Sequence, residues 1–330
     1  MRFFFFSRIS EEDATWLDRP FDEKEIFGVV HDFNADKALG LDGFTMAFFQ
    51  SCWSLVKIDI MKVFHIFHAH AMFEKSLNAT FLALIPKKID VVDVKGFRPI
   101  SLVGELYKII VKVLANRMRR VVHGLISESQ NAFVKGRQIL DSVLIASECL
   151  DNRLKARVSG VLCKLDIEKA YDHVNWEFLM FLLQQCGFSE KWRRWIRCCI
   201  STVKFSILIN GSPSDFFRSF RGIRQGDPLS PFLFDIFMEA LRHMLVAATA
   251  AGQFSGFTVG NVTSSLMTVS HLLFVDDTLV FCDVDSNHIT ALRGIHSSSS
   301  GISYGAILEM ILKFIWLNGI LFVLLFLRVD

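Results

Sequence analysis

The sequence has 330 residues, of which 52% are hydrophobic and 21% are charged. A chain of this length and composition can form a large core, and wholesale disorder and collagen-like fibres are excluded. Seven cysteines, an odd number without a Cys-x-x-Cys pair, argue against a secreted disulfide scaffold and a thiolate zinc site. They favour a reducing nuclear or cytoplasmic location with no disulfide partner.

Positive charge is concentrated in two segments, although the net charge of the chain is only +2. Between Pro86 and Arg137, eleven Lys or Arg residues stand against four Asp or Glu, and between Lys191 and Arg224 eight stand against one. Such segregation favours a surface that faces a polyanion, beside a carboxylate-rich remainder. Two solvated helix faces would give the same counts. Trp192 and Trp195, in the second segment, either stack on bases or anchor a helix to the core.

The first part of the chain predicts helices. After an acidic lead-in, a helix is expected to begin at Asp22, with Glu25 three residues later as in a capping box. Residues 36–43 (DKALGLDG) predict a loop. The stretch 44–73 contains no Gly or Pro and is rich in Phe, so it predicts one or two largely buried helices.

Strands and amphipathic helices follow in chain order. The apolar run 81–85, stopped by Pro86, predicts a strand. Residues 104–122 predict a helix with an outward-facing cationic stripe, and residues 139–154 predict a second amphipathic helix. Further strands are expected over 161–167 and 206–210, and residues 272–281 (LLFVDDTLVF) predict a hairpin.

Two adjacent aspartates lie at the centre of that hairpin. Asp276 and Asp277 occupy positions where a tight turn favours Asn-Gly or Asp-Gly, and their charges repel. Lys and Arg are absent between His271 and Asn287, and burial among apolar strands further penalises two carboxylates. The pair therefore predicts a site for a hard divalent cation such as Mg²⁺. An exposed Asp-Asp loop tip is the alternative.

A third carboxylate ends the strand over 161–167. Alternation places Leu162, Lys164 and Asp166 on one face of this strand. Asp166 could join the hairpin pair around two metal ions, as in-line phosphoryl transfer requires, or it could cap the next helix. The ring of Tyr171, five residues later, could lie under the sugar of a bound nucleotide and exclude a 2′-hydroxyl.

Two polar loops complete the candidate site. In RGIRQGDPLSPFLF (221–234), Gly226 allows close backbone approach to a ligand, and Gln225 offers a donor and an acceptor to a base or sugar edge. This loop leads into an apolar helix. Lys87 and Lys88 follow a strand, and Arg98 lies in GFRPISL, a loop suited to clamp a triphosphate. A general nucleic-acid surface would explain these cations nearly as well.

Eight segments, in order, resemble the reverse transcriptase domain of plant LINE-type (non-LTR) retrotransposons. They are DKALGLDGF, LALIPKK, GFRPISL, YKIIVKVLANR, SQNAFVKGRQILD, KLDIEKAYDHVNW, GIRQGDPLSPFLF and HLLFVDDTLVF. The resemblance runs from about Glu23 to Phe281. It departs from the family pattern at Leu39 and Leu41, where two prolines are usual, and at Val275, where alanine is usual and where we expect a strand to tolerate the extra bulk.

The resemblance implies an α+β right-hand polymerase with helical fingers and a palm built on an antiparallel sheet. It implies RNA-directed DNA synthesis from an RNA template, a DNA primer and deoxynucleoside triphosphates, with two Mg²⁺ ions. The roles implied for single residues are metal binding for Asp166, Asp276 and Asp277, sugar sensing for Tyr171, template and nucleotide contact for Gln225 and Gly226, and triphosphate contact for Arg98 and Lys87.

The expected organisation is a lead-in and helix over 1–35, a fingers-like basic region over 36–160, a palm over 161–285 and an atypical hydrophobic tail over 286–330. The tail has no equivalent of a thumb and suggests a truncated or frame-altered element. Between Ile307 and Leu327 the tail approaches membrane-span length, but Glu309 and Lys313 shorten its clean stretch, which favours a buried or badly formed helix. A catalytically inactive RNA-binding remnant is therefore the alternative function.

Overall fold

The structure, a computed structural model, describes residues 6–36, 39–134, 136–167, 169–259, 267–275, 277–285 and 320–327, with only the backbone described for Asp166 and for 320–327. The chain forms two compact units. Unit 1 comprises Met1–Ser7, His123–Val174 and Phe234–Asp330, and unit 2 comprises Arg8–Val122 and Asn175–Leu233.

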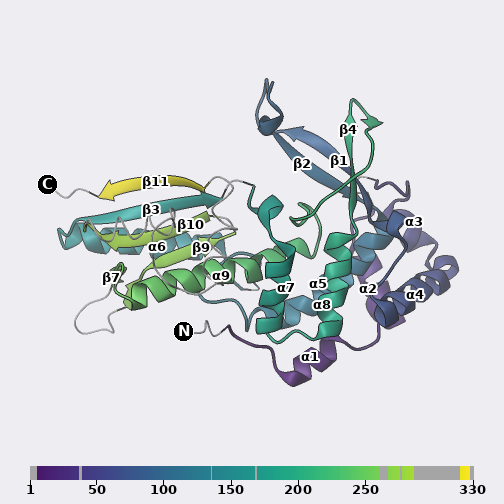
Figure 1. Ribbon diagram of the computed structural model, residues 1–330, viewed down its shortest axis with the longest axis horizontal. Coiled ribbons are helices and arrows are strands. Elements are labelled where there is room, and N and C mark those ends of the chain that lie inside the picture. The colour runs from purple at the N-terminus through teal and green to yellow at the C-terminus, as the bar shows by residue number, and fades with distance from the viewer. Residues whose placement is uncertain are drawn as a thin grey trace. The chain divides into compact units, whose positions relative to one another are not determined.

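Unit 2 contains most of the helices (Figure 1). They are α1 (Glu11–Leu17), α2 (Glu23–Asp32), α3 (Met46–Ser51), α4 (Trp53–His70), α5 (Glu105–Val122), α7 (Trp176–Gln185) and α8 (Glu190–Ser201), with the short 3₁₀ turns η1 (Lys75–Asn78) and η2 (Val94–Gly96). Asp22 caps α2 as predicted, because its carboxylate accepts the Glu25 amide at 2.8 Å. Asp42, in the loop after α2, caps α5, because its carboxylate accepts the Glu105 amide at 2.7 Å.

Arg117 of α5 lies inside the protein and is not part of an outward-facing cationic stripe on this helix. Its side chain is fully buried and forms an ion pair with Glu25, with Nη2 2.7 Å from Oε2. Its guanidinium also donates to the carbonyl oxygens of Leu17, Arg19 and Pro20. Because all five guanidinium donors can be used in such a fork, Arg117 fastens the chain between α1 and α2 to α5. The Glu25 carboxylate is engaged by this pair.

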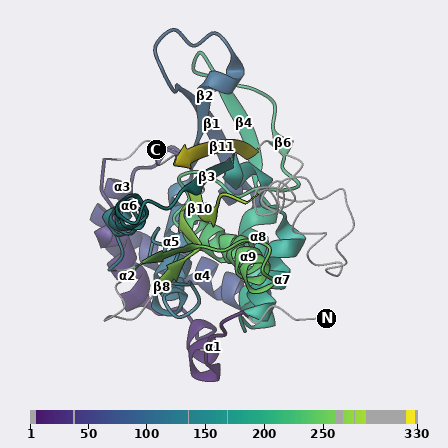
Figure 2. The same ribbon diagram turned by 90° about the vertical axis from the view of Figure 1, so that its left-hand side faces the viewer.

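A five-stranded sheet projects from the helices of unit 2 (Figures 1 and 2). Its strands are β1 (Ala79–Pro86), β2 (Phe97–Val103), β4 (Lys204–Ile209), β5 (Ser212–Pro213) and β6 (Phe217–Arg218), in the order β2-β1-β4-β5 with β6 also paired to β4. The prediction that GFRPISL is a loop was wrong. This segment is β2, and Pro99 is accommodated because β2 is an edge strand, which does not need every amide in the ladder.

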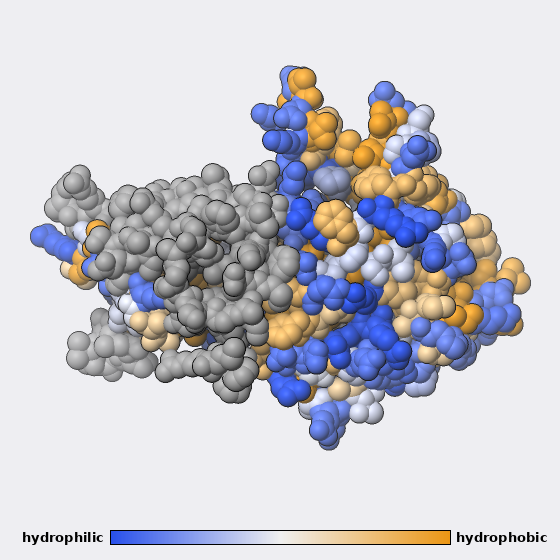
Figure 3. All heavy atoms as spheres, viewed as in Figure 1, coloured by the Kyte–Doolittle hydropathy of each residue, from blue (hydrophilic) through white to orange (hydrophobic). Residues whose placement is uncertain are grey.

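The tips of these projecting strands carry apolar and hydrophilic side chains side by side (Figure 3). Ile89 and Val92, in the turn between β1 and β2, are 89% and 98% exposed. The two tryptophans of α8 behave in the opposite way: Trp192 and Trp195 are both fully buried, at 0% exposure. Trp192 and Trp195 therefore anchor α8 to the core of unit 2, and stacking on bases is excluded for both.

Unit 1 is built on a four-stranded antiparallel sheet with the order β11-β3-β10-β9. Its strands are β3 (Gly160–Ile167), β9 (His271–Phe274), β10 (Asp277–Asp283) and β11 (Ile320–Leu327), beside the short pair β7 (Phe257–Val259) and β8 (Met267–Val269). The unit also contains α6 (Ile139–Lys155), most of α9 (Ser230–Ala250) and η3 (Ala170–His173). In Figures 1 and 2, α9 runs beside this sheet.

The apolar tail forms a strand over the part that the structure describes, so the expectation of a helix was wrong there. β11 pairs with β3 along its whole length, from Ile320 opposite Ile167 to Leu327 opposite Gly160. The sequence ILFVLLFL suits a strand because it is rich in aliphatic and aromatic residues and free of charge. β3 is thus an inner strand of the sheet, with β10 on its other side.

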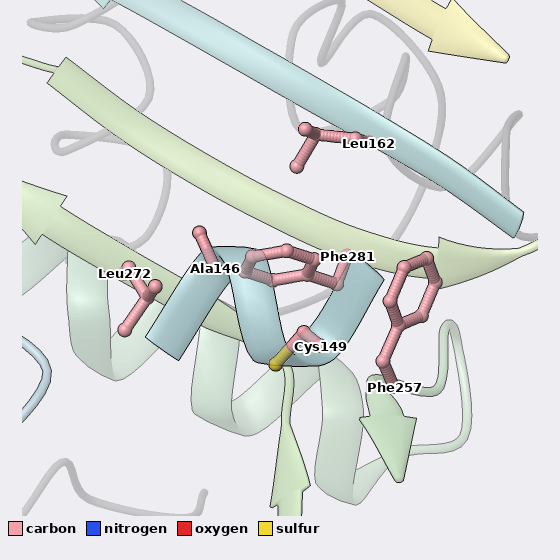
Figure 4. Close-up of a cluster of buried hydrophobic side chains, with 6 residues drawn as sticks. All are labelled: Ala146, Cys149, Leu162, Phe257, Leu272 and Phe281. Carbon is pink, nitrogen blue, oxygen red and sulfur yellow. The ribbon is translucent and has the colours of Figure 1, made fainter. Parts of the chain in front are cut away.

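The helix α6 packs on one face of this sheet (Figure 4). Ala146 and Cys149 of α6 form a buried cluster with Leu162 of β3, Phe281 of β10, and two further residues, Leu272 and Phe257. Lys164 lies two residues from Leu162 on β3, and Asp277 lies four residues from Phe281 on β10. Because alternate residues of a strand share a face, Lys164 and Asp277 lie on the same face of the sheet as this cluster.

The fold class agrees with an α+β protein that has a helical part and an antiparallel sheet. All seven cysteines are free. Within the described ranges, no helix is both long enough and apolar enough to cross a membrane.

Candidate active site

The β3–β10 ladder brings two of the predicted carboxylate residues together. In its register, Asp277 at the start of β10 is the Cα partner of Asp166 near the end of β3. These residues are 111 positions apart in the sequence, and the antiparallel pairing makes them direct neighbours across the sheet. Asp276 lies outside the described residues.

The hairpin between β9 and β10 turns one position earlier than expected. Phe274 pairs with Asp277, so Asp277 is the first residue of β10 and does not lie in the turn. Val275 lies in the turn with φ of 57°, a conformation that β-branched residues rarely adopt. The expectation that Val275 would be tolerated as a strand residue was therefore wrong: the residue is strained by its backbone angle.

A lysine from the neighbouring strand neutralises Asp277. The Nζ of Lys164 on β3 lies 2.7 Å from Oδ1 of Asp277, and the two side chains are 43% and 49% exposed. This partner could not be predicted from the sequence around the hairpin, which contains no Lys or Arg. Lys164 belongs to a distant strand and lies diagonally opposite Asp277 in the β3–β10 ladder. Among the side chains that the structure describes, no three His, Cys, Asp or Glu residues gather as a metal site.

Tyr171 has a fixed position at the end of β3. It belongs to η3 and its ring stacks on Phe234 at the start of α9, with centroids 4.6 Å apart and planes 13° from parallel. Stacking of this kind stabilises the ring in its observed orientation by about 0.5–1.5 kcal/mol. Tyr171, Asp166 and Asp277 therefore form one set of predicted site residues within unit 1.

The remaining predicted residues form a second set, within unit 2. Gln225 and Gly226 lie at the tip of a turn, with Gly226 at φ of 92°, a value that requires glycine. Arg98 is exposed on β2, where it pairs with Ile85 of β1. Lys87 is exposed just beyond β1, and its amide donates to the Gly96 carbonyl oxygen at 2.9 Å.

Two buried acids on α9 were not anticipated from the sequence. Asp235 is 0% exposed, and neither of its carboxylate oxygens has a hydrogen-bond partner among the residues that the structure describes. Desolvation, reinforced by the charge of Glu239, raises the pKa of Asp235 to about 8. Glu239 lies one turn later and accepts the amide and hydroxyl of Ser127 at 3.0 and 2.9 Å. Their apolar surroundings on the helix gave the only sequence signal.

We expect Asp235 to make the protein less stable as the pH rises from about 4 to about 8. In this range the unfolded chain has released the proton that the folded chain retains, so the free energy of unfolding falls with pH. Replacing Asp235 with leucine should remove this dependence and increase stability by roughly 1–3 kcal/mol at neutral pH. Thermal unfolding between pH 5 and 9 measures it, with exposed Asp151→Leu as the control. A parallel pH dependence in Asp235→Leu would contradict the assignment.

Comparison with known proteins identifies the family. Residues 85–306 match the family described as reverse transcriptase (RNA-dependent DNA polymerase). The match covers more than half of the chain and extends past Phe281, where the eight similar segments end. The chain therefore belongs to the reverse transcriptase family. Polyproteins of R2 retrotransposable elements are among the proteins that this chain resembles.

Three relatives illustrate the similarity. A Transposon TX1 uncharacterized 149 kDa protein of Xenopus laevis is 30% identical over 70% of this chain and 18% of its own length. A retrovirus-related Pol polyprotein from the type-1 retrotransposable element R2 of Nasonia vitripennis is 26% identical over 81% of this chain and 24% of its own length. An uncharacterized mitochondrial protein of Arabidopsis thaliana is 42% identical over 22% of this chain and 56% of its own length. The chain thus spans about a fifth to a quarter of the two longer relatives.

Proposed function

We propose that this chain carries out RNA-directed DNA synthesis, using an RNA template, a DNA primer and deoxynucleoside triphosphates. The observation that supports this proposal most directly is the register of Asp166 opposite Asp277 in a chain of the reverse transcriptase family. In phosphoryl transfer, positioning and electrostatic stabilisation supply most of the rate, and paired acidic residues are suited to hold the metal ions involved. The plant LINE-type assignment is part of this proposal, supported by the Arabidopsis relative.

Asp166, Asp276 and Asp277 are the proposed ligands of two Mg²⁺ ions. Oxygen donors suit this hard cation, and Asp277 already attracts a cationic group, since the Lys164 ammonium lies 2.7 Å from its Oδ1. The bound ions would lower the pKa of the primer 3′-hydroxyl and stabilise the leaving pyrophosphate. A metal ion bound at Oδ1 of Asp277 would compete with the Lys164 ammonium for this oxygen.

The nucleotide is the proposed ligand of the other site residues. We assign the sugar to Tyr171, which its stacking on Phe234 holds in place, and the templating base and incoming nucleotide to Gln225 and Gly226. Arg98 and Lys87, both exposed cations at the β1–β2 hairpin, are assigned to the triphosphate. Guanidinium groups suit this task because they bind phosphate oxygens in a bidentate manner.

In terms of organisation, we propose a lead-in and helix over 1–35, a fingers-like basic region over 36–160, a palm over 161–285 and a hydrophobic tail over 286–330. We further propose a nuclear or cytoplasmic location, supported by the seven free cysteines.

Primer extension tests the proposed activity. The chain, an RNA template and an annealed DNA primer are incubated with deoxynucleotides and Mg²⁺, and the extended products are separated by length. We expect extension that EDTA abolishes. A salt-sensitive complex with RNA that incorporates no nucleotide would contradict the proposal and favour a non-catalytic RNA-binding remnant.

Tyr171→Val should relax the selection against ribonucleotides. Removing the ring leaves space for a 2′-hydroxyl, so the ratio of kcat/KM for ribonucleotide over deoxynucleotide should rise on the order of tenfold or more. Single-nucleotide incorporation measures the ratio. Tyr171→Phe keeps the ring and should keep the selection, whereas equal ratios in Tyr171→Val and the parent would exclude Tyr171 as the sugar-sensing residue.

A further inference from the structure

An ion pair closes the turn that presents Gln225 and Gly226. Arg224 and Asp227 are the first and fourth residues of this turn, and the Nη2 of Arg224 lies 3.0 Å from Oδ2 of Asp227. Both side chains are buried, with 5% of each exposed. The two residues between them are less buried: Gln225 is partly buried and Gly226 is exposed. The Arg224–Asp227 ion pair is therefore buried, whereas the tip of the turn, residues 225–226, is more exposed.

The Arg224 side chain also fastens the turn to β1. Its Nη1 donates to Oδ1 of Asn78 at 2.6 Å and to Oγ1 of Thr80 at 3.1 Å. Asn78 is itself held, because its Nδ2 donates to the carbonyl oxygen of Cys199 at 3.0 Å. A guanidinium is suited to this position because its planar fork serves several acceptors in fixed directions.

The Asp227 side chain fastens the other end of the turn. Its Oδ1 accepts the Leu229 amide at 2.9 Å, which fixes the chain as it enters α9. The hydroxyl of Tyr107 on α5 lies 3.2 Å from Oδ2, and burial raises the pKa of this tyrosine well above its ordinary value, so the hydroxyl remains a donor. The guanidinium of Arg224 also lies over the Tyr107 ring, with Cζ 4.2 Å from the ring centroid.

The braced turn lies against β2. A Cβ added at Gly226 would lie 3.9 Å from the carbonyl oxygen of Ser101. Ser101 is three residues after Arg98 on the same strand. The turn tip and the proposed triphosphate-binding strand are therefore neighbours within unit 2, and a shift of the turn changes where Gln225 lies relative to that strand.

We infer that Arg224 and Asp227 are positioning residues for the incoming nucleotide: their buried ion pair and its hydrogen bonds to Asn78, Thr80 and Tyr107 hold the 225–226 tip in the geometry that nucleotide binding needs. This inference rests on the proposed function. Neither residue need touch the nucleotide, since both act through the backbone of the turn. Misplacing a binding group by about 1 Å is enough to cost on the order of a hundredfold in rate.

The decisive experiment combines nucleotide kinetics with hydrogen exchange on the full chain. Arg224→Lys retains the charge and loses the fork, and Asp227→Asn retains the shape and loses the charge. Both should raise KM for the deoxynucleotide on the order of tenfold or more, and amides of residues 221–229 should exchange faster while exchange elsewhere stays unchanged. The matched control is the exposed Arg197–Glu177 ion pair of the same unit, where Arg197→Lys should change neither readout.

A gentler variant covers the case in which a change in the buried pair prevents folding. Thr80→Val removes one acceptor of Arg224 and leaves both charges, so it should raise KM a few-fold, and Thr80→Ser should restore the parental value. Folded variants with parental KM and parental exchange at 221–229 would overturn the inference. A parent chain that incorporates no nucleotide would instead refute the proposed function. Hydrogen exchange at 221–229, together with equilibrium binding of the deoxynucleotide, would then decide whether the Arg224–Asp227 ion pair positions the turn for nucleotide binding.

Discussion

Replacing Asp277 with asparagine is expected to reduce primer extension by on the order of a hundredfold to a thousandfold or more, while the protein remains folded. Removing a group that stabilises the developing charge of a transition state typically costs a factor of 10² to 10³, and a lost metal ligand should cost at least as much. Stability should change little, because the Lys164–Asp277 pair is about half exposed and such pairs contribute about 0–1 kcal/mol. Primer extension and thermal unfolding are measured on the same preparation.

Asp285→Asn provides the control for this result. Asp285 is exposed just beyond the end of β10 and is remote from the strand start where Asp277 lies. Its loss should leave extension unchanged. Asp166→Asn should reproduce the Asp277→Asn result, and binding of RNA should survive in both variants. Parental extension by Asp277→Asn would refute the proposed role of the β3–β10 register.

Deleting the strand β11 is expected to destabilise unit 1. A chain ending at residue 319 loses the β11 partner of all eight β3 residues and keeps β10 on the other side. The ladder hydrogen bonds that are lost each contribute about 0.5–1.5 kcal/mol. The melting temperature should fall by on the order of 10 °C, with increased binding of a hydrophobic dye. Hydrogen exchange at 160–167 should accelerate, since the edge of β3 becomes exposed to water.

A chain ending at residue 327 is the matched control, since it keeps β11 and should behave like the parent. The opposite outcome has a clear meaning. If the chain ending at residue 319 is as stable as the parent or more soluble, and β3 amides remain protected, then β11 contributes nothing to the sheet and the apolar segment hinders folding.

The sequence predicted those elements whose local signals are unambiguous. Asp22 caps α2, the 44–73 stretch forms α3 and α4, and the 272–281 hairpin forms β9 and β10. Capping residues and apolar periodicity act within a few positions, so one stretch of chain contains the whole signal.

The errors came from segments whose structure depends on a distant partner. β2 contains Arg98 and Pro99, which suggest a loop, and only its edge position beside β1 makes the strand possible. For β11, a short apolar run fits a strand or a helix equally well, and the pairing with β3 decides between them.

The candidate site shows the same division. The carboxylates and the Gln-Gly turn could be identified by residue type, whereas Lys164 and the partners of Arg224 could not. Lys164 reaches Asp277 only because the strand register makes them diagonal neighbours, and Asn78 is 146 positions from Arg224. Spacing in the sequence carries no information on either contact.

The division of the chain into units has a consequence for its synthesis. Unit 2 consists of Arg8–Val122 and Asn175–Leu233, so all of its residues have been translated once Leu233 is made. The sheet of unit 1 needs β3 from the middle of the chain and β11 from near its end. During translation the helical unit can therefore fold first, while β3 waits about 110 residues for β10 and about 150 residues for β11. Unpaired strand edges of this kind make a nascent chain prone to aggregation, so a chaperone would protect it during this interval.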